Sequence, residues 1–137
     1  MATFGKIKFF WDSVGTVTQL IDKWSPRKCY SEKDYEQSLS RFLNREMPDI
    51  KVTPQYAIGR TKADLLIGEK VIVEIKKDLV STAQYDRLVG QLTRYKDWNG
   101  SVVVLLVGET DPDLSKDLTK FVNQNTPLFS EFVIKEK

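Results

Sequence analysis

The chain has 137 residues, of which 41% are hydrophobic and 29% are charged, as expected for one soluble globular domain. It has no histidine and a single cysteine, Cys29, which excludes Ser-His-Asp and Cys-His catalysis, histidine-based zinc hydrolysis, and Cys₄ zinc, cysteine-ligated iron–sulfur or disulfide frameworks within the chain. Any hydrolysis must therefore depend on carboxylates, lysine, tyrosine and a hard metal ion. The net charge of +2 permits nucleic-acid binding without arguing for it.

The sequence carries no signal for a membrane or for export. No apolar run reaches the roughly 18 residues of a membrane span. The N-terminus lacks the apolar core and cleavage site of a signal peptide. We therefore expect a cytoplasmic protein.

Residues 9–24 are predicted to form an amphipathic helix, which Ser25-Pro26 ends because a residue before proline avoids the α region. This boundary divides an N-terminal helical segment, 1–25, from the main domain, 26–137. The apolar stripe of the helix either docks on its own domain or contacts a second copy, a partner or the rest of a larger polypeptide. The basic and aromatic start of the segment, 6–11, could instead contact a membrane surface. The stripe consists of Phe10, Val14, Val17, Ile21 and Trp24.

A second helix is predicted from Ser31, as N-cap with Asp34 as its partial capping-box partner, to about Leu43. Glu36 should lie at the edge of its apolar face, and Glu32 within that face. The apolar face consists of Tyr35, Leu39, Phe42 and Leu43.

Three strand-like runs follow, at 51–58, 63–67 and 71–75, with turns at 59–62 and 68–70. The first alternates only loosely, whereas the other two are apolar and β-branched and are joined by a short glycine-containing loop, which is typical of a hairpin.

The C-terminal half alternates between helices and strands. A helix is predicted at 82–98, with Tyr85, Leu88, Leu92 and Tyr95 as its stripe and Trp98 at its end. The uninterrupted apolar run 101–107 indicates a strand covered on both faces of a sheet. A helix from 111 to about 123 and a strand at about 128–134 complete an α/β fold of order α-α-β-β-β-α-β-α-β, with a central mixed sheet flanked by helices.

The predicted hairpin places two acidic side chains and a lysine on the same face of the sheet. If its turn is centred on Glu69, residues equally far from it face each other, so that Asp64 lies opposite Glu74, with β-carbons about 4.5–5.5 Å apart. Because side chains alternate along a strand, Lys76 shares their face. The other face should enter the core, with Leu65, Ile67, Val71, Val73 and Ile75.

Two facing carboxylates in an apolar sheet are destabilising, because like charges repel and burial removes their hydration. A divalent cation removes both objections, and Mg²⁺ is often held by one or two carboxylates plus waters and phosphate. Lys76 would then polarise a water or stabilise charge on the phosphate. The alternative is a solvated strand face that continues into Lys77 and Asp78.

The following helix adds Gln91 and Tyr95, which are four residues apart and so share a face. That face can return over the sheet surface that carries the carboxylates. A glutamine can hold the lysine or a water there, and a tyrosine can bind phosphate. Alternatively, Tyr95 is a core residue and Gln91 lies at its boundary.

Together these residues resemble the PD-(D/E)XK, or restriction-endonuclease-like, nuclease superfamily. Its signature of an acidic residue and then Glu/Asp-x-Lys on the paired strand matches Asp64 and, after nine residues, Glu74-Ile75-Lys76. The Gln-x-x-x-Tyr of the RecB-like branch matches Gln91 to Tyr95, and the order of elements over 31–107 matches the family core. The family's proline is replaced by Ala63, at a position that varies widely.

The resemblance implies hydrolysis of DNA phosphodiester bonds by a metal-activated water. Asp64, Glu74 and the Ile75 carbonyl would bind Mg²⁺ or Mn²⁺, and Lys76 would orient the nucleophile. An acidic residue of the first family helix, Glu36 or in its place Glu32, would act through a water. Gln91 and Tyr95 would support Lys76 and the substrate backbone.

Basic residues near this site would contact DNA phosphates, which gives affinity without sequence choice. We expect about half of them to be ordinary solvated surface instead, and we expect Trp11 and Trp98 to be packed rather than stacked on bases. A module on the same fold that binds nucleic acid or protein without catalysis is the alternative, although the intact acidic pair and lysine argue against it. The basic residues are Arg60, Lys62, Lys77, Arg87, Arg94 and Lys96.

Overall fold

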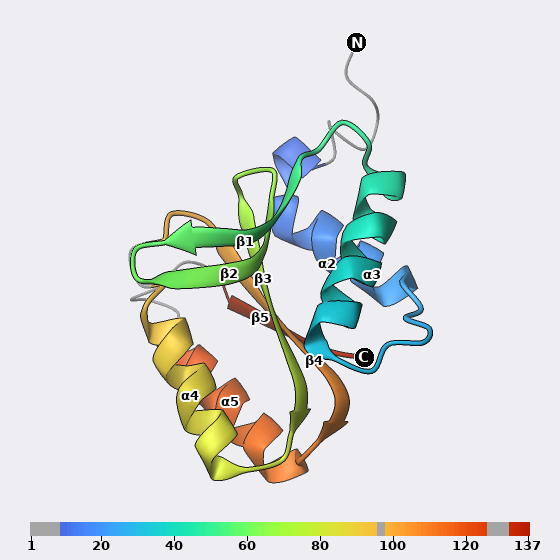
Figure 1. Ribbon diagram of the computed structural model, residues 1–137. Helices are drawn as coiled ribbons and strands as arrows, with labels where there is room; N and C mark the ends of the chain where they lie inside the picture. Colours follow the sequence, from blue (N-terminus) through green and yellow to red (C-terminus); the bar gives the residue numbers. More distant parts are fainter. Residues whose placement is uncertain (1–8, 96–97, 126–131) are drawn as a thin grey trace.

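The computed structural model describes residues 9–95, 98–125 and 132–137 (Figure 1). The helices and strands follow the predicted order, and the five described strands form one mixed sheet in the order β1-β2-β3-β4-β5. The β1–β2 and β2–β3 pairs are antiparallel, whereas the β3–β4 and β4–β5 pairs are parallel. The predicted α/β class with a mixed sheet is therefore confirmed. The elements are α2 (Ser13–Lys23), α3 (Glu32–Glu46), β1 (Val52–Ile58), β2 (Thr61–Ile67), β3 (Val71–Leu79), α4 (Thr82–Thr93), β4 (Ser101–Thr110), α5 (Pro112–Asn125) and β5 (Phe132–Glu136).

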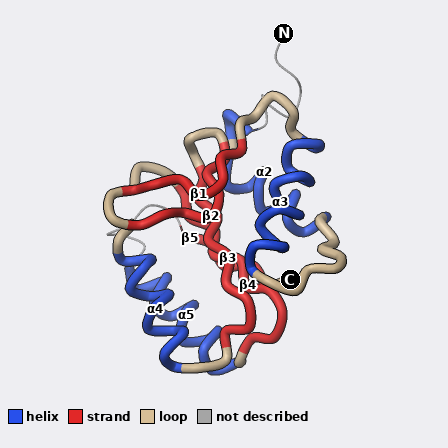
Figure 2. The backbone as a smooth tube through the Cα atoms, viewed as in Figure 1, coloured by secondary structure: helices blue, strands red, loops and turns tan. Residues whose placement is uncertain are grey.

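Helices cover both faces of the sheet, with α2 and α3 on one face and α4 and α5 on the other (Figure 2). The run from Ser101 to Val107 in β4 is wholly buried, which explains why it lacks the alternation of a half-exposed strand. The alternation predicted for the hairpin is confirmed, because the core under α2 and α3 contains Leu65, Ile67, Val71, Val73 and Ile75.

The predicted first helix is interrupted near its start, so that residues 9–11 are helical and α2 begins separately at Ser13. Asp12 interrupts the helical backbone, and its Oδ1 accepts a hydrogen bond of 3.1 Å from the Gly15 N–H as the N-cap of α2. The break shifts the phase of the preceding turn, so Phe9 is buried while Phe10 is 72% exposed and Trp11 is 81% exposed. The predictions that Phe10 belongs to the buried stripe and that Trp11 is packed are wrong.

The rest of that stripe docks on the chain's own sheet. Val17, Ile21 and Trp24 are buried in the same core as β3 and α3. The N-terminal segment therefore shares its hydrophobic core with the chain after Pro26.

The second helix starts as predicted. Ser31 Oγ accepts from the Asp34 N–H at 3.1 Å, and Asp34 Oδ2 accepts from the Ser31 N–H at 3.2 Å, which completes a capping box. The helix continues to Glu46, one turn beyond the predicted end at Leu43.

Several other boundaries differ. β2 begins two residues early, at Thr61, and β3 continues through its charged residues to Leu79 because it pairs with β4 up to Leu79↔Thr110. α4 ends at Thr93 instead of 98, where the Tyr95 N–H turns back to the Leu92 carbonyl at 3.1 Å. Trp98 packs against the core beneath α4 and α5, as expected. The start of the predicted last strand, Lys96 and the first half of the basic-aromatic stretch 6–11 lie outside the described residues.

No helix within the described ranges is both long and apolar enough to cross a membrane.

Candidate active site

The sheet opens at Asp64, where the pairing of β2 with β3 stops and its pairing with β1 is interrupted. The predicted register about Glu69 is confirmed for three pairs, Leu65↔Val73, Leu66↔Ile72 and Ile67↔Val71. The ladder stops there, so Asp64 and Glu74 are not the paired residues that we predicted. The ladder between β1 and β2 is also interrupted at Asp64, between Pro54↔Leu65 and Tyr56↔Ala63. Figure 1 shows the β1–β2 hairpin turning away from β3, which continues beside β4.

Beyond this opening, one edge of β3 has no neighbouring strand among the described residues, and two carboxylates accept hydrogen bonds from its backbone. The Ile75 N–H donates to Asp64 Oδ2 at 2.7 Å, and the Lys77 N–H donates to Glu32 Oε2 at 2.8 Å. Partly buried backbone N–H groups need acceptors, and here carboxylates take the place of a neighbouring strand. The backbone of β3 thereby fixes the positions of both acidic side chains.

Glu74 is the most buried carboxyl group of the site, with 4% of its surface exposed. The Tyr95 hydroxyl donates to Glu74 Oε2 at 2.6 Å. Burial, followed by the negative charge of Asp64, raises the pKa of Glu74 to about 9, although the Tyr95 hydrogen bond opposes the change. A side-chain hydrogen bond with Asp64 adds to this rise. The two carboxyl groups are therefore within hydrogen-bonding reach of each other, and Glu74 keeps its proton near neutral pH.

Gln55 connects a third carboxyl group to the pair. Its Nε2 donates to Glu36 Oε2 at 3.0 Å and lies 3.5 Å from Asp64 Oδ1. Glu36 is 7% exposed, and burial is the main cause that raises its pKa, while the Gln55 hydrogen bond opposes it. Gln55 adopts a left-handed conformation, with φ of 50°, which is unusual for a non-glycine residue in a strand.

Sequence reasoning did not find Gln55. The only signal was the loose alternation of 51–58, the strand in which the β1–β2 ladder skips Gln55.

Lys76 contacts Glu32 and not the predicted pair on α4. Its Nζ lies 3.8 Å from Glu32 Oε2. Gln91 Nε2 instead donates to the Lys62 carbonyl at 3.3 Å and to the Tyr95 hydroxyl at 3.4 Å. The prediction that Gln91 and Tyr95 support Lys76 is therefore wrong, because these side chains lie against Glu74 and the start of β2.

The two candidate acidic residues of α3 have different surroundings. They are four residues apart and so project from the same face of the helix. Glu36 is linked to Asp64 through Gln55, whereas Glu32 contacts Lys76 and the backbone of Lys77.

Two basic hollows adjoin the site, one on each side of the β1–β2 hairpin. The first, the α4 hollow, has a volume of about 610 Å³ and includes Gln91 and four of the basic residues predicted to contact DNA, namely Arg60, Lys62, Arg87 and Arg94. The second, the α3–β1 hollow, has about 310 Å³ and is lined by Glu36 and Gln55 with Lys33 and Arg41. The fifth predicted contact, Lys77, is instead paired with Asp78.

The donor set fits an open metal site. Within the described part of the chain, no three His, Cys, Asp or Glu side chains gather as a ready-made cage. Asp64 and Glu74 nevertheless present adjacent carboxyl oxygens, which suit a Mg²⁺ ion that takes its other ligands from backbone, water and phosphate. A divalent charge would also relieve the repulsion that raises the pKa of Glu74. The Ile75 carbonyl stays a predicted ligand.

No model of a known protein family matches the chain, and no curated protein matches it either. Among solved structures, it resembles that of SfsA from Pyrococcus furiosus in complex with Ca²⁺, with a TM-score of 0.47 and 11% sequence identity. The alignment covers 76% of this chain and 54% of SfsA, so the chain spans about half the length of that protein. Function therefore has to be inferred from the side chains of the site itself.

Proposed function

We propose that the chain is a metal-dependent nuclease of the PD-(D/E)XK kind, which hydrolyses DNA phosphodiester bonds with Mg²⁺ or Mn²⁺. The contact between the Asp64 and Glu74 carboxyl groups where the sheet opens carries this proposal. Two acidic groups in contact inside an apolar sheet destabilise the fold. Their placement is understandable if the site exists to bind a cation.

The chain's own groups would hold the cation with little rearrangement. Asp64, Glu74 and the Ile75 carbonyl would be its ligands, and Glu36 would act through a water. When bound, Mg²⁺ would polarise the scissile phosphate and lower the pKa of the attacking water. Because the Ile75 N–H fixes Asp64 and the Tyr95 hydroxyl fixes Glu74, both carboxylates are already oriented.

Lys76 would supply positive charge on the reacting side. As water attacks phosphorus and the P–O bond to the leaving group breaks, negative charge grows on the phosphate oxygens, and an ammonium group stabilises it. Glu32 restricts the positions of the flexible Lys76 side chain through its ion pair. Glu32 is therefore a positioning residue in this proposal.

The flanking hollows support a polyanionic substrate. The α4 hollow and the α3–β1 hollow place basic side chains on both sides of the carboxylates. A DNA backbone that crosses the site between them would gain affinity from phosphate contacts that do not read sequence.

The test is cleavage of plasmid and single-stranded DNA with Mg²⁺ or Mn²⁺. We expect Asp64→Asn, Glu74→Gln and Lys76→Ala each to lower the rate by about 100-fold or more. Asp113→Asn and Lys116→Ala, on the exposed surface of α5, are the matched controls and should retain the rate. Absence of cleavage with either ion on any DNA form would overturn the proposal. DNA binding indifferent to Mg²⁺ and to Glu74→Gln would then favour a non-catalytic binding module.

A further inference from the structure

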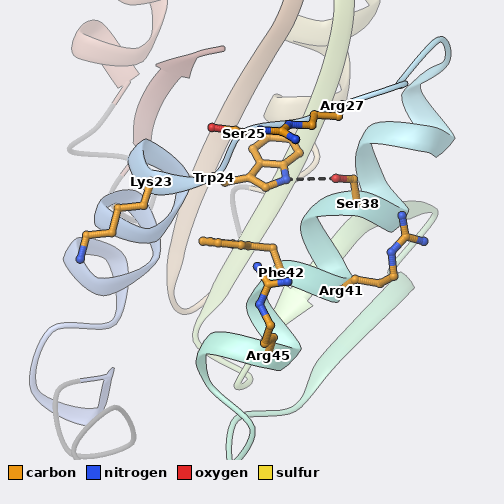
Figure 3. Close-up of a pocket in the computed structure, with 8 residues that line it drawn as sticks. All are labelled: Lys23, Trp24, Ser25, Arg27, Ser38, Arg41, Phe42 and Arg45. Carbon is orange, nitrogen blue, oxygen red and sulfur yellow. Dashed lines mark hydrogen bonds between the residues drawn. The ribbon is translucent and has the colours of Figure 1, made fainter.

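A third basic hollow, the α2–α3 hollow, lies between the end of α2 and the middle of α3, apart from the carboxylates (Figure 3). Its volume is about 480 Å³, and no acidic side chain is among the described residues that line it. Its charged lining residues are Lys23, Arg27, Arg41 and Arg45.

The floor of this hollow is a fixed aromatic surface. The buried Trp24 indole donates from Nε1 to Ser38 Oγ at 3.1 Å, which ties the end of α2 to α3. Beside it, the Phe42 ring lies 5.4 Å from the Arg45 guanidinium, in cation–π geometry. The surrounding cations therefore project from a rigid base, and Figure 3 shows that they come from α2, the following loop and α3.

The charge of the hollow is poorly compensated. Arg45 pairs with Glu46 at 3.8 Å, but its side chain is 73% exposed, so this ion pair is weak. For Lys23, Arg27 and Arg41, no ion pair forms within the described residues. Several guanidinium groups around one hollow match the oxygens of phosphate groups, which they bind through paired hydrogen bonds.

Arg41 connects this hollow with the candidate active site. It also lines the α3–β1 hollow, together with Glu36 and Gln55. Arg41 is five residues after Glu36 and so lies about 140° around the helix from it. A chain of phosphates that leaves the site can therefore pass over α3 and remain next to positive charge. This continuity favours a polynucleotide over an isolated phosphate ion.

We propose that the α2–α3 hollow binds backbone phosphates of the same DNA strand that occupies the active site, several nucleotides from the scissile bond. The inference rests on the proposed function for the identity of the polyanion. Binding can nevertheless be measured without cleavage, so the two proposals can fail separately.

The experiment measures fluorescence anisotropy of labelled single-stranded DNA in EDTA, with oligonucleotides of about 4 and about 20 nucleotides. The test variant is Arg27→Gln with Arg45→Gln, because both residues line the α2–α3 hollow and neither lines the hollows next to the carboxylates. The matched control is Lys116→Gln with Lys120→Gln, which removes two exposed charges from α5. Thermal melting confirms that each variant is folded.

We expect the test variant to bind the long oligonucleotide about 10-fold more weakly, with a salt dependence shallower by about 1.4, or about 0.7 for each lost phosphate contact. The short oligonucleotide and the control should change by less than about 2-fold. Unchanged affinity for the long strand, or an equal loss for both lengths or in the control, would overturn the inference. So would displacement of the long strand by inorganic phosphate at an ionic strength at which chloride is ineffective, because that result indicates a free-phosphate site.

The outcomes also separate the two proposals. Length-dependent binding through Arg27 and Arg45 without cleavage would support the inference and contradict the proposed function. Metal-dependent cleavage, together with a long-strand affinity that does not depend on Arg27 and Arg45, would support the proposed function and contradict the inference.

Discussion

The Tyr95 hydroxyl donates a hydrogen bond of 2.6 Å to Glu74 Oε2, and both side chains are buried. Tyr95 follows the end of α4, whereas Glu74 lies in β3. The bond therefore ties the layer of α4 and α5 to the carboxylate that the proposed metal site depends on.

Tyr95→Phe removes this donor with little change of shape. We expect a loss of about 1–2 kcal/mol in the free energy of unfolding and an increase of about 10-fold in the Mg²⁺ concentration needed for half-maximal cleavage. Urea denaturation and a metal titration measure the two effects. Tyr85→Phe, a half-buried tyrosine of α4, is the control. An unchanged Mg²⁺ concentration for half-maximal cleavage would show that this hydrogen bond stabilises the fold but does not support the metal site.

Glu74 should make the stability depend on pH. Because the pKa of Glu74 is raised to about 9 in the folded protein, the folded state keeps a proton that the unfolded state releases above about pH 4.5. Stability should therefore fall as pH rises from there towards about 9. Glu74→Gln has no such proton. We expect its stability relative to the natural chain to rise by on the order of 4 kcal/mol between about pH 5 and pH 8.

Urea denaturation without divalent ions, at several pH values, measures this difference. Glu109→Gln, on an exposed carboxylate, should follow the natural chain at every pH. A pH-independent difference between Glu74→Gln and the natural chain would contradict the raised pKa of Glu74.

A divalent cation should stabilise the folded protein. An ion that binds only the folded state raises the free energy of unfolding by about 2.7 kcal/mol at 100 times its Kd. We therefore expect Mg²⁺ or Mn²⁺ to raise the Tm, and EDTA to reverse the effect. Asp64→Asn and Glu74→Gln should each abolish the rise, whereas Asp113→Asn should not. An equal rise in all variants would indicate a site elsewhere on the surface.

The local parts of the fold were predictable from sequence because they depend on neighbouring residues. The capping box of Ser31 and Asp34, and the register about Glu69, follow from side-chain spacing and turn length alone. The long apolar run in β4 was equally readable, since burial on both faces removes any need for polar residues.

The parts that failed depend on changes of direction that spacing does not encode. A single break at Asp12 rotated Phe10 and Trp11 out to solvent. Because the sheet opens at Asp64, the predicted pairing of Asp64 with Glu74 does not form, and the Asp64 side chain accepts a hydrogen bond from the backbone of β3 instead. The ion pair between Glu32 and Lys76 joins a helix to a strand that is distant in sequence, so no local sequence pattern predicts it.

Glu32 can be tested as a positioning residue for Lys76. In Glu32→Gln the side-chain oxygen can still accept the Lys77 N–H, but the charge that attracts the Lys76 ammonium is lost. We expect kcat to fall by about 3- to 10-fold with the Mg²⁺ requirement and KM unchanged. Glu32→Ala should add a loss of stability of about 1–2 kcal/mol, because the Lys77 N–H then lacks its acceptor. Equal kinetics for Glu32→Gln and the natural chain would remove the ion pair from the proposed mechanism.

Substitutions of Gln55 should separate the effect of backbone strain on stability from the effect of the side chain on DNA cleavage. Its left-handed backbone disfavours any residue with a β-carbon, and its side chain links Glu36 to Asp64. Gln55→Gly and Gln55→Ala both remove the link, but only glycine relieves the strain.

We therefore expect Gln55→Gly to unfold at higher urea than Gln55→Ala, by about 1 kcal/mol, while both cleave DNA about 10-fold more slowly. At Ala57, also in β1 and exposed, the ordering should reverse, with Ala57→Gly less stable than the natural chain by about 0.5–1 kcal/mol. Full activity in Gln55→Gly would mean that Asp64 needs no support from α3. The interruption of the β1–β2 ladder would then serve only to open the sheet.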